Sequence, residues 1–568
     1  MMGSIAAIST AIVTTLVYLI HTTYHHRSKI NALRRNGMPM PKGWNWFTGH
    51  LLTLQEYVDK LPPDANVNLA MNDLALEFAD TEVFLMDFWP VYPALLMVYD
   101  PDTAVQISTK YNLPKTDMHL QFMKPITGGP NLVSMSGLEW KFWRTLFNPG
   151  FSSSAMMDNV PHIVNFVQVF CDKLKENAGR GMLLLDGLTT RLTMDVIIKL
   201  TLDADLDYQR SENALATSLG YITRWHSFWD PRILMHPLRP FIQKYHGRVM
   251  DNYIQNELDQ RFSEIRARFN DPDAEQSNAT KSVITLAIES YIQENKSNDL
   301  MQKPKLDSHF AKYATHQIRL FLFAGNDTTS STIVYVYHLL SQHPEALKSL
   351  RKEHDDVFGT DIFGTDINQT AKLLREQPTL LNKCPFTLAV IKETLRLCPP
   401  AATMRAGQPG VKVTDRHGNC YPMDYVGATL LHPAIHRNPR VWPLPNDFLP
   451  ERFLVDPGHE LYPNPAAYRP FEQGPRNCIG QTLVYNEIRI VMIMTVRMFD
   501  VKPAYEEWDA MREREIGVLG RFKKSVFGEP VKTVRGDRAY QTEKAGTHPA
   551  DGYPCRISLR GGGGGEME

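Results

Sequence analysis

The strongest chemical signal in the chain is the segment FEQGPRNCIG at 471–480, which places one cysteine before an apolar stretch. A metal ligand must be a thiolate, and Arg476 together with the N–H groups at the start of the following helix would favour that charge. Gly474 and Gly480 lack side-chain bulk, so the backbone can approach a flat ligand. The segment predicts that Cys478 is a metal-binding thiolate. The alternative is a buried structural cysteine in a turn.

A second segment, AGNDTT at 324–329, falls inside a helix expected over 307–342. Ala324 and Thr328 are four residues apart and share one face of that helix. The threonine hydroxyl can bond its own i−4 carbonyl or pass on a proton, and the adjacent Asp327 can relay protons from solvent. The alternative is an ordinary core helix with a solvated aspartate.

Two charged motifs accompany these segments. Glu393 and Arg396 in KETLR are three residues apart on a helix, and FLPERF supplies Arg452 later in the chain. A solvated pair of this kind would contribute only about 0.2 to 0.5 kcal/mol. In GLEWKFWR, Trp140 and Arg144 are one helical turn apart and can face the same carboxylate. An amphipathic helix with a packing aromatic is the alternative for this motif.

Together these motifs resemble the cytochrome P-450 family, over about residues 40 to 560. The family's haem-binding loop has the form F-x-x-G-x-R-x-C-x-G, matched here by Phe471, Gly474, Arg476, Cys478 and Gly480. The resemblance implies a mainly α fold with a smaller β region (α+β), a single large domain preceded by an N-terminal transmembrane helix. It also implies a haem b whose iron takes its axial thiolate from Cys478.

The resemblance assigns roles to the other residues. Asp327 and Thr328 would manage protons, while Ala324 and the glycine after it would leave room above the haem. A structural network would join Glu393, Arg396 and Arg452. The haem propionates would be held by Trp140, Arg144, Arg405 and Arg476. The substrate pocket would be lined by Phe122, Ala324, Ala401, Ala402, Thr403 and Met404, whose apolar character points to a hydrophobic, polycyclic or terpenoid molecule.

The expected activity is insertion of one oxygen atom from O2 into such a molecule, in the style of fungal secondary metabolism. A thiolate ligand favours O–O cleavage. No flavin or dinucleotide fingerprint occurs, so electrons would come from NADPH through a separate reductase that carries FAD and FMN, with cytochrome b5 as a second candidate donor. A net charge of −1 gives no argument for nucleic acid.

Two rival functions stay open at this point. A haem-thiolate isomerase or dehydratase would act without a reductase, although such enzymes tend to lack the acid and alcohol that Asp327 and Thr328 supply. The other rival is a membrane-anchored haem or sterol binder without turnover. A zinc site is a separate idea, because His432 and His436 have H-x-x-x-H spacing and Cys384, Cys398 and Cys420 are nearby in sequence. The cysteine spacings do not form C-x-x-C pairs, which disfavours zinc.

The N-terminus suggests a location. Residues 3–20 are uncharged and mostly apolar, long enough for a transmembrane helix of roughly 18 residues. Four cations follow: Arg27, Lys29, Arg34 and Arg35. The positive-inside rule then predicts a single-pass protein of the endoplasmic reticulum membrane whose catalytic domain faces the cytosol. A cleaved secretory signal is the alternative, but its positive n-region is missing. The six scattered cysteines also fit a reducing compartment.

These observations predict four segments. Residues 1–22 form the anchor, 23–50 a basic and proline-rich hinge, 51–558 the haem-thiolate monooxygenase domain, and 559–568 a flexible Gly-rich tail. Helical periodicity is expected around 156–178, 186–203 and 244–268, and strands near 82–99 before a DPD turn at 100–102. The Arg- and Lys-rich stretch 511–544 is expected to be a solvated loop, with contact to reductase or anionic lipid as the alternative.

Overall fold

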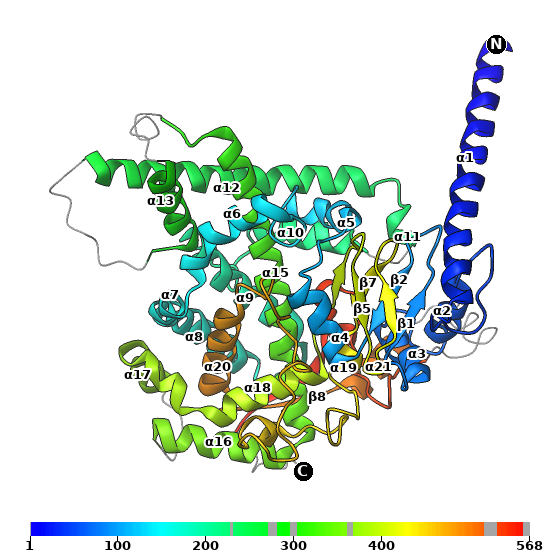
Figure 1. The fold of residues 1–568 in the computed structure, drawn as a ribbon. Coiled ribbons are helices and arrows are strands. Elements are labelled where there is room, and N and C mark those ends of the chain that lie inside the picture. Colours follow the sequence, from blue (N-terminus) through cyan, green and yellow to red (C-terminus); the bar gives the residue numbers. More distant parts are fainter. Residues whose placement is uncertain are drawn as a thin grey trace.

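Helices make up most of the chain (Figure 1). The structure, a computed structural model, describes residues 2–227, 231–270, 281–295, 304–359, 367–515 and 531–560. In the first half the helices are α1 (Met2–Arg35), α2 (Leu51–Val58), α3 (Val67–Ala75), α4 (Pro101–Val105), α5 (Asp117–Thr127), α6 (Gly137–Phe147), α7 (Ser153–Asp158), α8 (Val160–Asn177), α9 (Leu185–Leu202), α10 (Ala214–Arg224), α11 (Pro231–Leu234), α12 (Arg239–Asn270) and α13 (Val283–Asn295). In the second half they are α15 (Ser308–Gln342), α16 (Pro344–Phe358), α17 (Ile367–Glu376), α18 (Pro385–Leu397), α19 (His432–Ile435), α20 (Gln481–Thr495) and α21 (Tyr505–Glu515).

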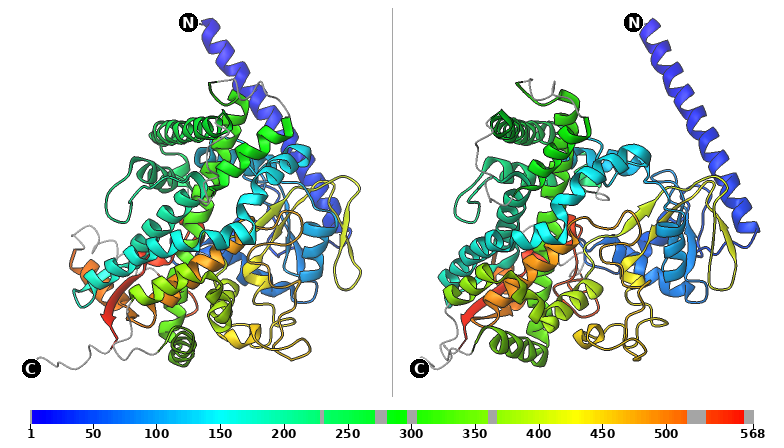
Figure 2. Two further views of the ribbon diagram at one scale, coloured as in Figure 1. Left: turned by 90° about the vertical axis from the view of Figure 1, so that its left-hand side faces the viewer. Right: turned by 60° about the vertical axis from the view of Figure 1, so that its left-hand side comes forward.

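Helix α15 runs through the middle of the molecule, with α9 packed along it (Figures 1 and 2). It begins where the Asp307 side chain accepts the N–H groups of His309 and Phe310. It ends at Gln342, because His343 precedes a proline and proline disfavours helical backbone at the residue before it. The helix expected over 307–342 is therefore confirmed. The larger of the apolar clusters surrounds α15 and includes α8, α9 and α20.

In the described residues, nine strands form three small sheets. The strands are β1 (Val83–Met86), β2 (Leu95–Val98), β3 (Met182–Leu184), β4 (Thr403–Arg405), β5 (Lys412–Thr414), β6 (Cys420–Pro422), β7 (Gly427–Leu430), β8 (Phe499–Pro503) and β9 (Pro554–Leu559). The four-stranded sheet has the order β1-β2-β7-β4, in which β2 and β7 are parallel and the other pairs antiparallel. The others have the orders β3-β9-β8 and β5-β6, all antiparallel. A second apolar cluster packs around the four-stranded sheet.

The predicted strands near 82–99 are present as β1 and β2, but the expected DPD turn is the start of a helix. The Asp100 side chain accepts the N–H of Thr103 and caps α4, with Pro101 at its first position. Proline is favoured there because the first helical N–H has no partner inside the helix. The mainly α architecture with small sheets agrees with the expected fold class.

The N-terminal segment differs from its prediction. Among the helices that the structure describes, none is both long enough and apolar enough to cross a membrane. Hydroxyl side chains interrupt the apolar run of α1, and Thr14 and Thr15 bond back to the carbonyls of Thr10 and Ala11. The segment predicted to be a hinge is helical over its first part, because α1 continues without a break to Arg35.

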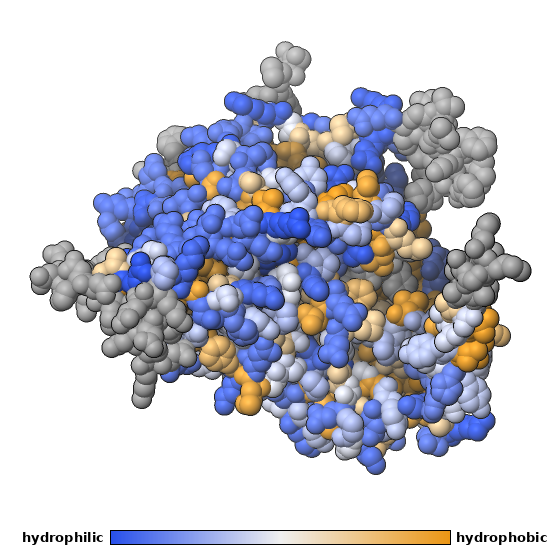
Figure 3. Space-filling view, turned by 90° about the horizontal axis from the view of Figure 1, so that it is seen from above, coloured by the Kyte–Doolittle hydropathy of each residue, from blue (hydrophilic) through white to orange (hydrophobic). Residues whose placement is uncertain are grey.

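Arg27, one of the four cations that follow the apolar stretch, is a buried anchor for α1. Its side chain is 0% exposed and contacts the Asp87 carboxylate. It also donates to the carbonyl oxygens of Trp46 at 2.7 Å and Trp89 at 2.8 Å. The C-terminal half of α1 is thus fastened to the end of β1, while its N-terminal half projects from the body (Figure 2). Seen from above Figure 1, apolar surface forms separate patches among polar ones (Figure 3).

The second half of the basic stretch packs against the molecule, so the solvated-loop prediction is wrong for residues 531–544. Val534 and Tyr540 are buried in a small cluster with Ala550. The Tyr540 hydroxyl donates to Asp64 at 2.6 Å. Residues 516–530 and 561–568, including the basic GVLGRFKKS segment and most of the Gly-rich tail, lie outside the described residues.

Candidate active site

The loop that carries Cys478 is closed by its own backbone. The Cys478 N–H donates to the Phe471 carbonyl at 2.8 Å, and the Asn477 N–H donates to the Gly474 carbonyl at 3.1 Å. The Phe471 ring meets Tyr485 of α20 edge to face at 5.1 Å, which holds the loop against that helix. The sulfur therefore sits at a defined place just before α20 begins.

The two glycines of the loop serve different purposes. Gly474 has φ +79°, and a Cβ there would lie 2.7 Å from the Ser108 carbonyl oxygen. Its conformation is the left-handed one that glycine adopts without strain, and it packs the loop on the protein rather than on a ligand. At Gly480 a Cβ would meet no atom closer than the Cys478 sulfur, at 4.0 Å. Only Gly480 thus keeps room beside the sulfur, as the sequence interpretation required.

The surroundings of Cys478 shift the pKa of its thiol in opposite directions. Burial raises the pKa of its thiol, although the side chain keeps accessible surface, while the Gly480 N–H and the Arg144 guanidinium lower that pKa. The cation that favours the thiolate is thus Arg144 and not Arg476. Since a bound metal itself displaces the thiol proton, the residue is suited to become a thiolate on ligation.

Arg144 and Trp140 contact different protein groups, and their joint role on a haem propionate stays a prediction. Arg144 donates to the carbonyl oxygen of Asn477 at 2.9 Å and to its Oδ1 at 3.0 Å. The Trp140 ring instead packs under Arg476, 4.6 Å from ring centroid to guanidinium carbon. A cavity of about 400 Å³ lies beside this stack, with Trp140, Arg476 and Pro114 in its wall.

Four cations converge near this stack: Lys115, Arg144, Arg405 and Arg476. Arg405 is fully buried, and among the described residues its Nε and Nη2 have no hydrogen-bond partner. The Nε and Nη1 atoms of Arg476 are likewise buried without a partner there. Burial, with Arg405 and Arg476 nearby, lowers the pKa of Lys115 to about 7. Buried donors without acceptors are costly, so this cluster fits an anionic ligand with several oxygens.

The AGNDTT segment lies in the middle of α15. The Thr328 hydroxyl donates to the Ala324 carbonyl at 2.8 Å, the first of its two expected roles. A Cβ at Gly325 would be 2.7 Å from Cδ1 of Ile197, so this glycine allows α9 to approach α15 rather than making room above a ligand. Asp327 is not a solvated carboxylate, because burial raises its pKa and its Oδ1 accepts from His548 Nε2 at 3.0 Å.

Glu393, Arg396 and Arg452 form a fully buried network, so the solvated-pair alternative is excluded. Arg396 donates to both oxygens of Glu393 at 2.8 Å, and Arg452 Nε donates to Oε1 at 3.2 Å. All three side chains are 0% exposed. The network joins α18 to the 3-10 turn at Pro450–Phe453.

Comparison with known proteins decides the family. The family model for cytochrome P-450 matches residues 38–524. The chain belongs to the cytochrome P-450 family. A cytochrome P-450 monooxygenase named polC, from Polytolypa hystricis, is 37% identical over 560 residues, which covers 97% of this chain and 95% of the relative. The monooxygenase acrF from Aspergillus aculeatus is 32% identical over 521 residues, covering 88% and 98%. Cytochrome P-450 3A6 from Oryctolagus cuniculus is 27% identical over 439 residues, covering 75% and 80%.

Cytochrome P-450 monooxygenases bind haem through a cysteine thiolate and receive electrons from a separate redox partner. The residues present fit this group. Cys478 presents a sulfur with free space at Gly480, and the unpartnered guanidinium N–H groups of Arg405 and Arg476 can donate hydrogen bonds to two carboxylates. This protein is therefore a haem-dependent oxidoreductase, in agreement with the sequence interpretation.

The residues predicted for the substrate pocket are not gathered by the described cavities. Phe122 lies in α5 and Ala324 in α15, while Thr403 and Met404 form part of β4. Ala401 is exposed, and its carbonyl accepts from His432. Neither of the two cavities whose walls are defined contains any of these residues or Ala402. Their role in the cytochrome P-450 pocket stays a prediction.

The histidines of the zinc alternative have other partners. His432 Nε2 lies 3.3 Å from Glu472, and His436 Nε2 accepts the Arg469 N–H at 2.9 Å. Within the described part of the chain, no group of three or more His, Cys, Asp or Glu side chains could hold a metal ion. The two histidines therefore brace the chain just before and at the start of the loop that carries Cys478.

Sequence reasoning missed Lys115, Asp186 and His548. Lys115 donates to the Met404 carbonyl at 3.4 Å from within the cation cluster. Asp186 and His548 contact each other across some 360 positions, and His548 also contacts Asp327. No motif marks these residues, because each belongs to a different segment and meets the others only in the fold.

Proposed function

We propose that this protein inserts one oxygen atom from O2 into a hydrophobic small molecule of secondary metabolism, with Cys478 as the axial ligand of its haem. The observation that carries the proposal is the arrangement around Cys478. Its sulfur faces free space at Gly480, and buried arginines with unpartnered N–H groups lie near by. A thiolate and an anion-binding cluster are the two features that a haem-thiolate site requires.

The chain's residues divide the work between binding and proton handling. Arg405 and Arg476 would hold the haem propionates, and Arg144 with the Gly480 N–H would stabilise the negative charge on sulfur. The bound haem supplies the activation of oxygen. Asp327 and Thr328 would deliver protons. For this the Thr328 hydroxyl has to turn from the Ala324 carbonyl, to which it now donates.

The alternative function, a haem-thiolate isomerase or dehydratase that needs no reductase, is not favoured. The similar fungal proteins polC and acrF are both named monooxygenases. We infer that electrons come from an NADPH reductase carrying FAD and FMN, with cytochrome b5 as a second donor. We further propose that the protein works at the endoplasmic reticulum membrane with its catalytic part facing the cytosol. Apolar side chains exposed on α1 support membrane contact, as do those near the start of α12: Val13, Leu16, Val17, Ile20, Met235 and Phe241.

A spectrum and a product assay test the proposal. The reduced, CO-bound protein should show the Soret band of a thiolate-ligated haem, and Cys478→Ala should lose it. Microsomes containing the protein and a reductase should form an oxygenated product from a hydrophobic precursor only with NADPH. A histidine-type spectrum in the wild-type protein would refute ligation of the haem by Cys478. Product formation without NADPH would refute the need for an NADPH-dependent reductase.

A further inference from the structure

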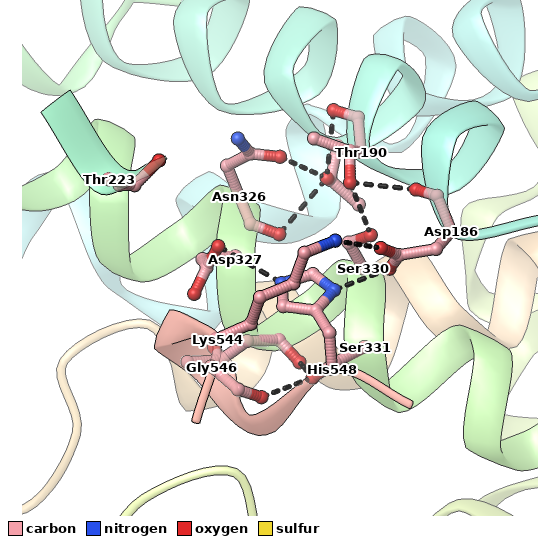
Figure 4. A network of polar contacts seen from close by, with 12 residues as sticks. Asp186, Thr190, Thr223, Asn326, Asp327, Ser330, Ser331, Lys544, Gly546 and His548 are labelled. Carbon is pink, nitrogen blue, oxygen red and sulfur yellow. Dashed lines mark hydrogen bonds and ion pairs between the residues drawn. The ribbon is translucent and has the colours of Figure 1, made fainter. Parts of the chain in front are cut away.

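Asp327 is connected to a second buried carboxylate through one histidine (Figure 4). His548 Nε2 lies 3.0 Å from Asp327 Oδ1, and its Nδ1 contacts Asp186 Oδ1. Asp327 belongs to α15 and Asp186 to the first turn of α9, whereas His548 follows the 3-10 turn at Ala545–Thr547. One imidazole therefore joins three segments that are distant in sequence.

The other oxygen of Asp327 is closed off. Among the described residues, Asp327 Oδ2 is buried without a hydrogen-bond partner. Gly546 covers it, since a Cβ at this residue would lie only 2.3 Å from Oδ2. The Gly546 carbonyl accepts from Ser331 of α15 at 2.8 Å, which keeps the cover in place. The polar route that the structure provides to Asp327 is therefore His548.

The far end of this route reaches a cavity. Asp186 Oδ2 lies 3.4 Å from Lys544 Nζ, and both residues line a cavity of about 410 Å³. Its wall also contains Asp64, Glu543 and Asp551. A polar wall of this size can hold water, which supplies protons. The charged groups that face the imidazole are Asp186 from α9, Asp327 from α15 and Lys544 from its own segment.

We propose that His548 carries protons from the cavity at Asp186 and Lys544 to Asp327. It acts on the reaction through Asp327. The inference rests on the proton-handling role proposed above for Asp327. In one delivery the imidazolium gives its Nε2 proton to the Asp327 carboxylate. It keeps its Nδ1 proton, which stays hydrogen-bonded to Asp186. The neutral ring then turns so that its free Nε2 takes a proton from cavity water through Asp186, and this restores the imidazolium without accumulating net charge.

The ionisation of these groups agrees with the route. Burial alone would lower the pKa of His548, but Asp186 and Asp327 raise it to about 10. Burial likewise would raise the pKa of Asp186, yet its contacts with His548 and Lys544 lower it. At neutral pH the imidazole therefore carries the proton that it would deliver.

A second histidine on α15 offers a matched control. His338 Nε2 lies 2.8 Å from Asp537 Oδ2, so this pair also joins α15 to the segment near the C-terminal end. Both histidines are buried. Within the described ranges, no hydrogen bond or ion pair joins the His338 pair to Asp327, so His338→Gln should disturb a similar brace without disturbing the route.

The kinetic test uses the full-length haem protein with a reductase and NADPH, without added organic substrate. Hydrogen peroxide released per NADPH consumed is measured against pH. In His548→Gln and Asp186→Asn this ratio should rise by about twofold or more and its pH profile should change, since proton-transfer groups contribute on the order of 100-fold to their step. His338→Gln should match the wild type. The reduced, CO-bound spectrum of every variant checks that thiolate ligation persists.

The outcomes separate this inference from the proposed role of Asp327. If Asp327→Asn and Thr328→Ala raise the ratio while His548→Gln and Asp186→Asn do not, the His548 route is wrong and the role of Asp327 stands. If Asp327→Asn also leaves the ratio unchanged, both are wrong.

A measurement without turnover gives an independent check. The imidazole nitrogens are observed by NMR in the ¹⁵N-histidine-labelled, reduced and CO-bound protein, and the resonance lost in His548→Gln identifies His548. It should report a doubly protonated ring up to about pH 9, given the raised pKa. A neutral His548 at pH 7 would overturn the inference.

Discussion

Arg144 binds Asn477, the residue just before the candidate haem ligand, through two hydrogen bonds. It donates to the Asn477 carbonyl at 2.9 Å and to Asn477 Oδ1 at 3.0 Å. The same guanidinium lowers the pKa of Cys478. A single side chain thus sets both the position of the loop and the charge of its sulfur. This double role makes Arg144 more informative to mutate than the other arginines near the site.

Arg144→Gln should weaken thiolate ligation, because it removes the cation that favours the ionised sulfur. We expect a smaller fraction of reduced, CO-bound protein with the thiolate Soret band than in the wild type. On acidification, the variant should lose that band at a higher pH than the wild type. Arg210→Gln is the control, since Arg210 is 56% exposed and pairs with Asp207 at the surface. Equal spectra for the two variants would contradict the role of Arg144.

Gly474→Ala and Gly480→Ala should have separable effects. The first forces a side chain onto the Ser108 carbonyl at positive φ, so we expect a loss of about 1 to 3 kcal/mol in the free energy of unfolding. The second meets no close protein atom and should leave stability nearly unchanged, but should lower haem content by filling the space beside the sulfur. Denaturant unfolding and haem absorbance measure the two quantities. The assignment fails if Gly480→Ala binds haem normally.

Glu393→Gln should destabilise the fold strongly. The substitution leaves Arg396 and Arg452 buried without their counter-ion, at a cost of about 3 to 5 kcal/mol. Lys352→Ala breaks an exposed pair with Asp356 and should cost no more than about 0.5 kcal/mol. Urea unfolding compares the two variants, and similar losses would show that the buried network contributes little.

Asp87→Asn should release the C-terminal half of α1. Burial by itself would raise the pKa of Asp87, but contacts with His26, Trp44 and Arg27 lower it to about 2. A lowered pKa means that the stabilisation is present above about pH 4 and is lost as pH falls towards 2. Hydrogen exchange of residues 20–35 should therefore be faster in the variant at pH 7. Arg35→Ala, at an exposed position, should leave exchange unchanged.

The pH dependence of stability should reveal the charge of His548. Its pKa is raised from 6.5 to about 10 in the folded protein, so its stabilising contribution is complete below about pH 6.5 and is lost as pH rises towards 10. The difference in free energy of unfolding between the wild type and His548→Gln should shrink over that range. A difference that is constant from pH 6 to 10 would show that the ring is not an imidazolium.

Much of this organisation is readable in the sequence because it depends on local features. The extent of α15 follows from its cap at Asp307 and the proline after His343. The cysteine loop and the Glu393, Arg396 and Arg452 motifs have diagnostic residue types at fixed spacing. Such patterns reflect backbone preferences within a few residues, or a ligand that every member of the family must hold.

Tertiary packing decided the rest. The sequence could not indicate that Gly474 rests on Ser108, that Gly325 admits α9, or that Arg27 is buried on Asp87. The same is true of His548, which meets Asp327 across 221 positions. Burial and partner choice depend on which distant surfaces pack together, and that is not encoded in local periodicity. The sequence by itself therefore determined the family and predicted the haem ligand, whereas the folded structure decided which cation lies beside the sulfur and which side chains contact Asp327.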